Sequence, residues 1–160
     1  MGGRAAGERL ARMAASPNWH DGSFVNVHPV ADGLRDPNVP FPGPGKFLFK
    51  DERRFPKRRL PADNPLRTWA TPSETGLRIT WLGHSTVLLE IDGYRVITDP
   101  VWGHRASPSA MVGPKRFQPV PVHLHDVPSV DAVIISHDHY DHLDYPTIRA
   151  LARTPVPFVT

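Results

Sequence analysis

The pattern of hydrophobic and polar positions changes sharply at Leu77. Segments 77–82 and 86–91 are rich in Ile, Val, Leu and Trp, a composition that is typical of β-strands. Asp92-Gly93 is a strong two-residue hairpin signal, and segment 94–98 follows it as the returning strand. The sequence therefore predicts three consecutive strands that end next to Asp99.

The pattern further along the chain predicts a buried strand followed by a helix. Residues 132–135 form a short unbroken apolar run, which is typical of a strand buried on both faces. Asp144 is a candidate helix N-cap with Pro146 in the first turn. Apolar side chains then recur at helical spacing, namely Tyr145, Ile148, Leu151 and Ala152. Residues 156–160 begin another strand, so the pattern indicates an α/β domain.

No comparable pattern precedes Leu77. Residues 1 to about 15 have weak helical character, and segment 16–75 contains ten prolines without a helical or strand period. We therefore expect a long, irregular, proline-rich N-terminal arm over residues 1–76. The α/β domain is expected over residues 77–160.

A basic segment at 46–59 is the main feature of this arm. It combines seven Lys and Arg residues with three phenylalanines. Cationic and aromatic side chains together suit a membrane interface, so one interpretation is peripheral contact with phospholipid headgroups. The favoured alternative is a solvated arm laid over the domain, with its phenylalanines in the core.

Composition narrows the classes of partner and compartment. The net charge of +3 is mildly basic, which suits a nucleic acid, an anionic membrane surface or a phosphate substrate but is equally compatible with no special partner. We expect no nucleic-acid partner. The absence of cysteine excludes disulfides and thiolate metal ligands. No run has the length of a transmembrane span, and the N-terminus lacks the apolar stretch of a secretory signal. A cytoplasmic location is therefore expected, and peripheral membrane contact through segment 46–59 stays open as the less favoured interpretation.

The chemistry is concentrated in six residues after the apolar run, which are His137, Asp138, His139, Tyr140, Asp141 and His142. Imidazole nitrogen and carboxylate oxygen are the ligands that zinc takes when thiolates are absent. We expect His137 and His139 to bind one metal ion, and Asp141 and His142 to bind a second beside it. Such a metal pair can hold a hydroxide and clamp a phosphoryl or carbonyl group.

Other polar residues are candidates for supporting roles. Asp99 follows a predicted strand, where its carboxylate can accept the second N–H of a ligand histidine; the alternative is a turn residue before proline. His84 is a weaker candidate of the same kind. His123 and His125 lie between prolines and are interpreted as surface residues. We assign the remaining isolated histidines, His20, His28 and His104, to loops.

At this point the sequence resembles the metallo-β-lactamase superfamily. The resemblance rests on residues 137–142, called the metal run below, on the buried strand before them and on Asp99. Within the superfamily it is similar to N-acyl-phosphatidylethanolamine-hydrolysing phospholipases D. That narrower similarity rests on segments 80–86, 98–100, 105–109, 113–117 and 135–145, and it covers about 77–151.

The resemblance implies the N-terminal half of an αβ/βα sandwich with two zinc ions at one edge. It implies His137 and His139 on the first zinc, Asp141 and His142 on the second, and Asp99 in support. The family reaction is hydrolysis of a phosphodiester to an N-acylethanolamine and phosphatidic acid, and Asp141 is the residue we expect catalysis to need most.

The family takes its remaining metal ligands from the second half of the fold. Each zinc has only two ligands from the residues identified here, so the sequence indicates a truncated chain of doubtful activity. Two alternatives stay open. One is a sugar-lactone or phosphoester hydrolase, or a nuclease, of the same fold. The other is an inactive fragment that binds metal or a membrane.

Overall fold

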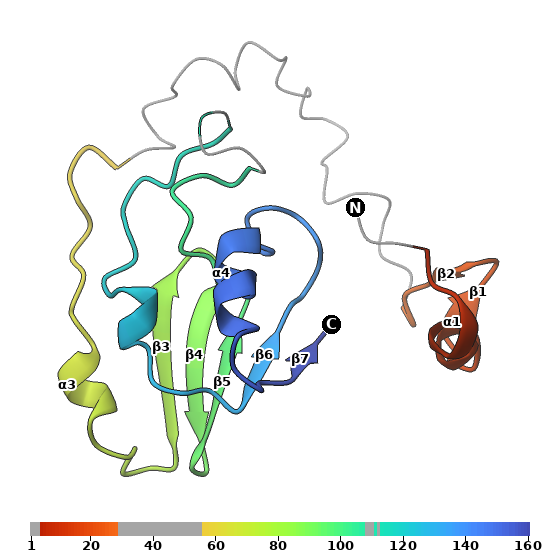
Figure 1. Cartoon of the computed structure of the whole chain (residues 1–160), viewed down its shortest axis with the longest axis horizontal. Helices are drawn as coiled ribbons and strands as arrows, with labels where there is room; N and C mark the ends of the chain where they lie inside the picture. Colours follow the sequence, from red (N-terminus) through yellow and green to blue (C-terminus); the bar gives the residue numbers. More distant parts are fainter. Residues whose placement is uncertain (1–3, 29–55, 108–110, 112) are drawn as a thin grey trace. The chain divides into compact units, whose positions relative to one another are not determined.

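The computed structural model describes residues 4–28, 56–107, 111 and 113–160. The chain forms two compact units, Met1–Asp51 and Glu52–Thr160. The first unit contains helix α1 (Gly7–Ala14), which agrees with the weakly helical start, and a small hairpin of β1 (Trp19–His20) and β2 (Ser23–Phe24) (Figure 1). The hairpin was not predicted, because strands of two residues are too short to show a period.

The second unit is built on a five-stranded sheet in the order β3-β4-β5-β6-β7. The first three strands are antiparallel, and β5, β6 and β7 run parallel. The bounds are β3 Leu77–Gly83, β4 Thr86–Ile91, β5 Tyr94–Thr98, β6 Ala132–Ile134 and β7 Phe158–Val159. Helix α4 (Tyr145–Leu151) connects β6 to β7, and the short helices α3 (Leu66–Trp69) and η1 (Leu124–Asp126) lie in the remaining connections.

The predicted α/β class and strand positions are confirmed. The β4–β5 hairpin turns at Asp92 and Gly93, which have φ of 48° and 88°. Positive φ at both positions is the requirement of the tight turn that matches strand twist, which explains the Asp-Gly pair. Asp144 has extended backbone angles at the N-cap of α4, and Pro146 lies in the first turn, as predicted.

One face of the sheet carries the core. Leu88, Ile97 and Val133 are register neighbours on β4, β5 and β6, and all three are fully buried. Helix α4 lies over this face in Figure 1, and Ile148 and Leu151 from α4 pack against the same cluster. The core therefore joins the strands to the helix that follows the metal run.

The core also includes Trp69 from α3. Its side chain is 4% exposed, and its indole N–H donates to the hydroxyl of Thr80 at 3.0 Å. Part of the segment assigned to the irregular arm thus packs with the sheet. Of the basic segment 46–59, residues 46–55 lie outside the described residues, and Pro56 to Arg59 are exposed.

The opposite face of the sheet is apolar and exposed. Ile79 and Trp81 on β3 are 61% and 58% exposed, and Val159 on β7 is 53% exposed. The prediction that 132–135 is buried on both faces was wrong at Ile134, which is 39% exposed. Ile134 pairs with Thr98 and Val159, so its side chain belongs to this face, which no described helix covers.

In the described parts of the chain no helix has the length and apolar character needed to cross a membrane.

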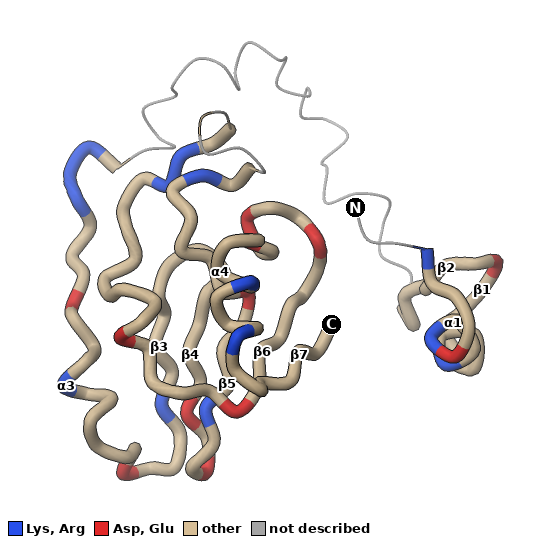
Figure 2. The backbone as a smooth tube through the Cα atoms, viewed as in Figure 1, with Lys and Arg blue, Asp and Glu red and all other residues tan. Residues whose placement is uncertain are grey.

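A cluster of charged residues lies on the core face of the sheet, at the end that carries the β4–β5 hairpin. Glu90 is 6% exposed and lies in register between Arg78 and Arg95. Arg78 Nη2 donates to Glu90 Oε1 at 2.8 Å, and Arg95 Nε donates to the same oxygen at 3.3 Å. Figure 2 shows basic and acidic residues gathered where β3, β4 and β5 meet the hairpin turn. The hydrogen bond from Arg78 holds the pKa of Glu90 below its usual value.

We expect the Glu90→Gln variant to lose less free energy of unfolding than the unaltered chain when the pH falls from neutral to acidic. Because the folded pKa lies below 4.5, the ionised carboxylate stabilises the fold above about pH 4.5, and this contribution is lost as the pH falls through the lowered pKa. At pH 7 the variant should lose about 1–3 kcal/mol, because both arginines lose their charged acceptor. Urea unfolding at pH 7 and at pH 3 measures both effects. The exposed Glu74→Gln variant is the control, and equal pH dependence in both variants would contradict the assignment.

Candidate metal centre

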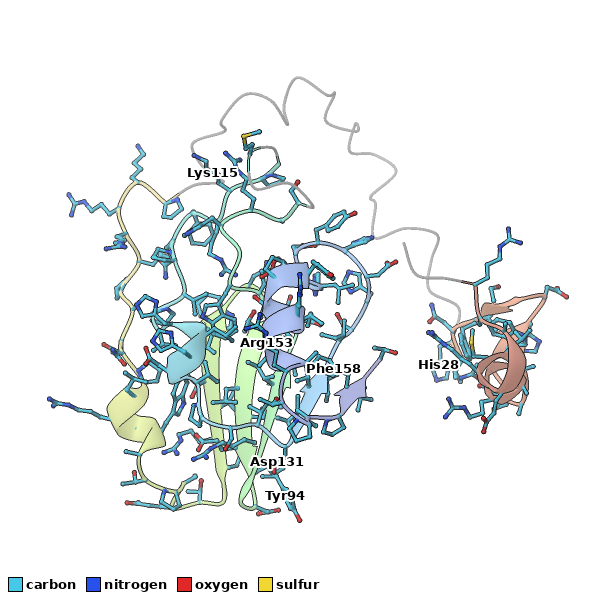
Figure 3. The ribbon with its side chains drawn as sticks, viewed as in Figure 1. His28, Tyr94, Lys115, Asp131, Arg153 and Phe158 are labelled. Carbon is cyan, nitrogen blue, oxygen red and sulfur yellow. The ribbon has the colours of Figure 1, made fainter. Side chains whose placement is uncertain are left out.

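The candidate site lies at one end of the strands of the sheet, namely the end opposite the β4–β5 hairpin. Strands β3, β5 and β6 all end there, because β3 and β5 are each antiparallel to β4, and β6 is parallel to β5. His84 lies in the β3–β4 turn, Asp99 directly follows β5, and the metal run follows β6. In Figure 3 Tyr94 and Asp131 mark the hairpin end, and Lys115 lies toward the other end. The topology therefore brings three chain segments together at one end of the sheet.

His84, Asp141 and His142 form the tightest group of candidate ligands. Each offers one ligand atom, and these atoms all lie within 4.8 Å of one another. Asp141 Oδ2 lies 2.9 Å from His84 Nε2 and 3.6 Å from His142 Nε2. Two imidazoles and a carboxylate at this spacing suit a divalent zinc-like ion, so the donor chemistry fits the metal that the fold implies.

His137 and His139 lie beside this group. The ring centroid of His137 lies 4.6 Å from that of His139 and 4.0 Å from that of His142. Both side chains are exposed, whereas Asp141 and His142 are half-buried. The structure thus brings all four candidate ligands of the run into one cluster. Their division between two metal ions stays a prediction.

Asp99 is buried beneath the cluster. Its Oδ2 lies 2.9 Å from His142 Nδ1, and its Oδ1 accepts the backbone N–H of Ser136 at 2.7 Å. Burial raises the pKa of Asp99, but the hydrogen bonds from His142 and Ser136 outweigh it, so the pKa lies below its usual value. These are the contacts that a carboxylate makes when it orients a ligand histidine. A backbone φ of 39° at Asp99 is the strained geometry that often accompanies functional residues.

His84 contacts Asp141 of the metal run directly. Its backbone has a φ of 49°, and its carbonyl accepts the indole N–H of Trp81 at 2.7 Å. From the sequence we expected only a weak supporting role for His84, whereas the structure brings its ring to Asp141, 57 residues away. Burial raises the pKa of Asp141, but a backbone amide and His84 outweigh it, so the pKa is lowered. His84 is therefore a candidate ligand as well as a partner of Asp141.

Asp144 ties helix α4 to the loop after Asp99. Its carboxylate is buried and accepts the backbone N–H groups of Trp102 at 3.3 Å and Gly103 at 3.0 Å, and the hydroxyl of Thr147 also donates to it. A Cβ at Gly103 would lie 2.9 Å from Asp144 Oδ1, so glycine permits this approach. The end of the metal run is held in place by these bonds.

The remaining histidines are not members of this ligand group. The rings of His123 and His125 stack with centroids 5.2 Å apart, and both side chains are exposed. His20, His28 and His104 are also exposed, and His20 lies in β1 rather than in the predicted loop. Within the described ranges, the group around Asp141 is the one set of three or more candidate ligands that could hold a metal ion.

Sequence reasoning missed Ser136. It directly precedes the first histidine of the run, and its hydroxyl lies 2.7 Å from Asp99 Oδ2 and 2.9 Å from His137 Nδ1. A hydroxyl adjacent to a metal run was the available signal, but sequence alone gives no partner for it.

The mixed sheet brings a His/Asp cluster to its strand ends, and this donor set suits a divalent metal ion. Residues 94–160 match the family model of the β-lactamase superfamily domain. Over these residues the chain is similar to the metallo-β-lactamase superfamily, which confirms the predicted resemblance.

Its relatives include longer proteins. An uncharacterized protein of Mycobacterium tuberculosis is 46% identical over 151 residues, which cover 94% of this chain and 40% of that protein. N-acyl-phosphatidylethanolamine-hydrolyzing phospholipase D 1 of Caenorhabditis elegans is 51% identical over 79 residues, covering 49% of this chain and 22% of the relative. A metal-dependent hydrolase of Methanopyrus kandleri is 37% identical over 67 residues, covering 42% and 24%. The chain thus spans two fifths or less of these relatives.

Proposed function

We propose that this chain contributes the metal-binding end of the β-sheet in a zinc-dependent phosphodiesterase. The substrates of this enzyme are N-acyl-phosphatidylethanolamine-like phospholipids. The observation that carries the proposal is the convergence of His84, Asp141 and His142, whose ligand atoms lie within 4.8 Å of one another. The similarity to the nematode phospholipase D supports the substrate class, because it is 51% identical over 79 residues.

In this proposal His137 and His139 hold one zinc ion, and Asp141 and His142 hold the other. Zinc held by these residues would supply Lewis-acid chemistry and would activate water for hydrolysis near neutral pH. Asp99 keeps the ring of His142 turned toward Asp141 through the contact at Nδ1. His84 fixes the carboxylate of Asp141 through the 2.9 Å contact to Oδ2. The exposed rings of His137 and His139 leave the cluster open to substrate.

The loop after β5 supports the lipid assignment. Arg116 Nη2 donates to the carbonyl of Val101 at 2.7 Å, and a Cβ at Gly83 would meet Arg116 Nη1 at 2.8 Å. The guanidinium of Arg116, in the loop that carries the phospholipase resemblance, therefore lies against Gly83, the residue before His84. Segment 46–59 completes the proposal as a peripheral membrane contact, on the strength of its interleaved basic and aromatic residues.

The test is hydrolysis by the zinc-loaded chain of three substrates in parallel. These are vesicles containing N-acyl-phosphatidylethanolamine, a sugar lactone and single-stranded DNA. We expect release of N-acylethanolamine and phosphatidic acid, detected by mass spectrometry and abolished by a chelator. Faster turnover of the lactone or DNA would favour the alternative hydrolases. No turnover of any substrate would favour the inactive metal- or membrane-binding fragment. The Asp138→Ala variant, altered in the same run outside the tight ligand group, controls for nonspecific damage.

A further inference from the structure

The hydroxyl of Ser136 lies between one buried carboxylate and two candidate ligand histidines. Ser136 Oγ is 2.7 Å from Asp99 Oδ2, 2.9 Å from His137 Nδ1 and 3.3 Å from His142 Nδ1. Asp99 Oδ2 also contacts His142 Nδ1 directly at 2.9 Å. Both rings therefore present Nδ1, rather than Nε2, to the same supporting group.

The possible positions of the protons follow from the donors and acceptors present. The carboxylate of Asp99 accepts the backbone N–H of Ser136 on one oxygen and faces the Ser136 hydroxyl and His142 Nδ1 with the other, and a carboxylate can only accept hydrogen bonds. The single hydroxyl proton of Ser136 must then be donated to Asp99. The oxygen of Ser136 is left as an acceptor, so its short contact with His137 needs a proton on Nδ1 of that ring. The same reasoning assigns a proton to Nδ1 of His142, which faces Asp99 directly.

We propose that Ser136 is a positioning residue that extends the influence of Asp99 to His137, so that one carboxylate sets the tautomer of two metal ligands. In a neutral imidazole a proton on Nδ1 leaves the lone pair on Nε2, the atom then available to a metal ion. Asp99 acts on His142 directly and on His137 through the serine hydroxyl. The inference rests on the proposed metal site, because it treats both rings as ligands.

The test compares Ser136→Ala with Ser136→Thr in the metal-free chain. Ring ¹⁵N chemical shifts, measured by NMR near pH 8, report which nitrogen of each histidine carries the proton. We expect alanine to release His137 into a mixture of tautomers. His142 should keep its proton on Nδ1, because its direct bond to Asp99 remains. Threonine retains the hydroxyl and should restore the pattern of the unaltered chain. The backbone N–H of Ser136 still reaches Asp99 in both variants, so neither should unfold the chain.

Zinc affinity is the second readout, measured by competition with a chromophoric chelator. Supporting partners of ligand histidines typically contribute about 10–100-fold to metal affinity, and Ser136→Ala should lose an amount in this range that threonine recovers. An unchanged His137 tautomer in the alanine variant would overturn the inference, and so would an equal change in both rings or an unchanged zinc affinity. A chain that shows the expected tautomers but hydrolyses no lipid would count against the proposed function alone.

Discussion

Replacing Asp141 with alanine should lower the zinc affinity of the chain by more than about 100-fold, which exceeds the range expected for a supporting partner. Asp141 is the one carboxylate in the tight ligand group, and its Oδ2 lies 2.9 Å from His84 Nε2 and 3.6 Å from His142 Nε2. Alanine removes a negatively charged ligand and leaves two imidazoles, which is too few for a stable zinc site. Chelator competition at constant pH measures the loss.

Three comparisons decide whether that loss is specific. Asp138→Ala changes the same residue type three positions earlier, outside the tight group, and should have little effect. Asp99→Ala should cost about 10–100-fold, because it only orients a ligand. His125→Ala should have no effect, since His125 is exposed, stacks on His123 and is not a member of the ligand group. If His125→Ala proves as damaging as Asp141→Ala, the metal site lies in the 123–125 loop instead.

Replacing Trp69 with alanine should destabilise the second unit by about 3–5 kcal/mol, the usual cost of truncating a buried aromatic side chain. Trp69 is 4% exposed in the core, and its indole N–H is bonded to Thr80. Domains are stable by only about 5–15 kcal/mol, so this change removes a large part of the total. Urea unfolding followed by circular dichroism measures it.

Trp81→Ala is the matched control for this stability measurement. Trp81 is the same residue type on the opposite face of the sheet, where it is 58% exposed and makes one hydrogen bond to the backbone of His84. We expect it to cost about 1 kcal/mol, the contribution of a typical hydrogen bond. Equal losses in the two variants would mean that α3 does not pack in the core.

The strands and the ligand run could be predicted because their signals are local. The apolar segments at 77–82 and 86–91 lie on either side of a short turn, and Asp92-Gly93 fixes the next turn by its own backbone requirements. Four candidate ligands within six residues need no tertiary information to be recognised. These features depend on neighbours in sequence, so pattern alone identifies them.

The rest depends on contacts between distant segments. His84 meets Asp141 across 57 residues, and Asp99 meets His142 across 43. No period marks α3, which has only four residues, so the burial of Trp69 was not visible in the sequence. Ile134 was expected to be buried because an unbroken apolar run does not reveal which sheet face is covered. These contacts and the burial of Trp69 and Ile134 depend on how the sheet is assembled in three dimensions. The sequence pattern alone does not contain that information.

The location of zinc in a crystal of this chain tests the account most directly. Anomalous diffraction measured on both sides of the zinc absorption edge reveals the metal without assumptions about its ligands. We predict a peak between His84, Asp141 and His142, with any second peak beside His137 and His139. Zinc bound at His123 and His125, or a cluster that stays empty at saturating zinc while the protein remains folded, would contradict it.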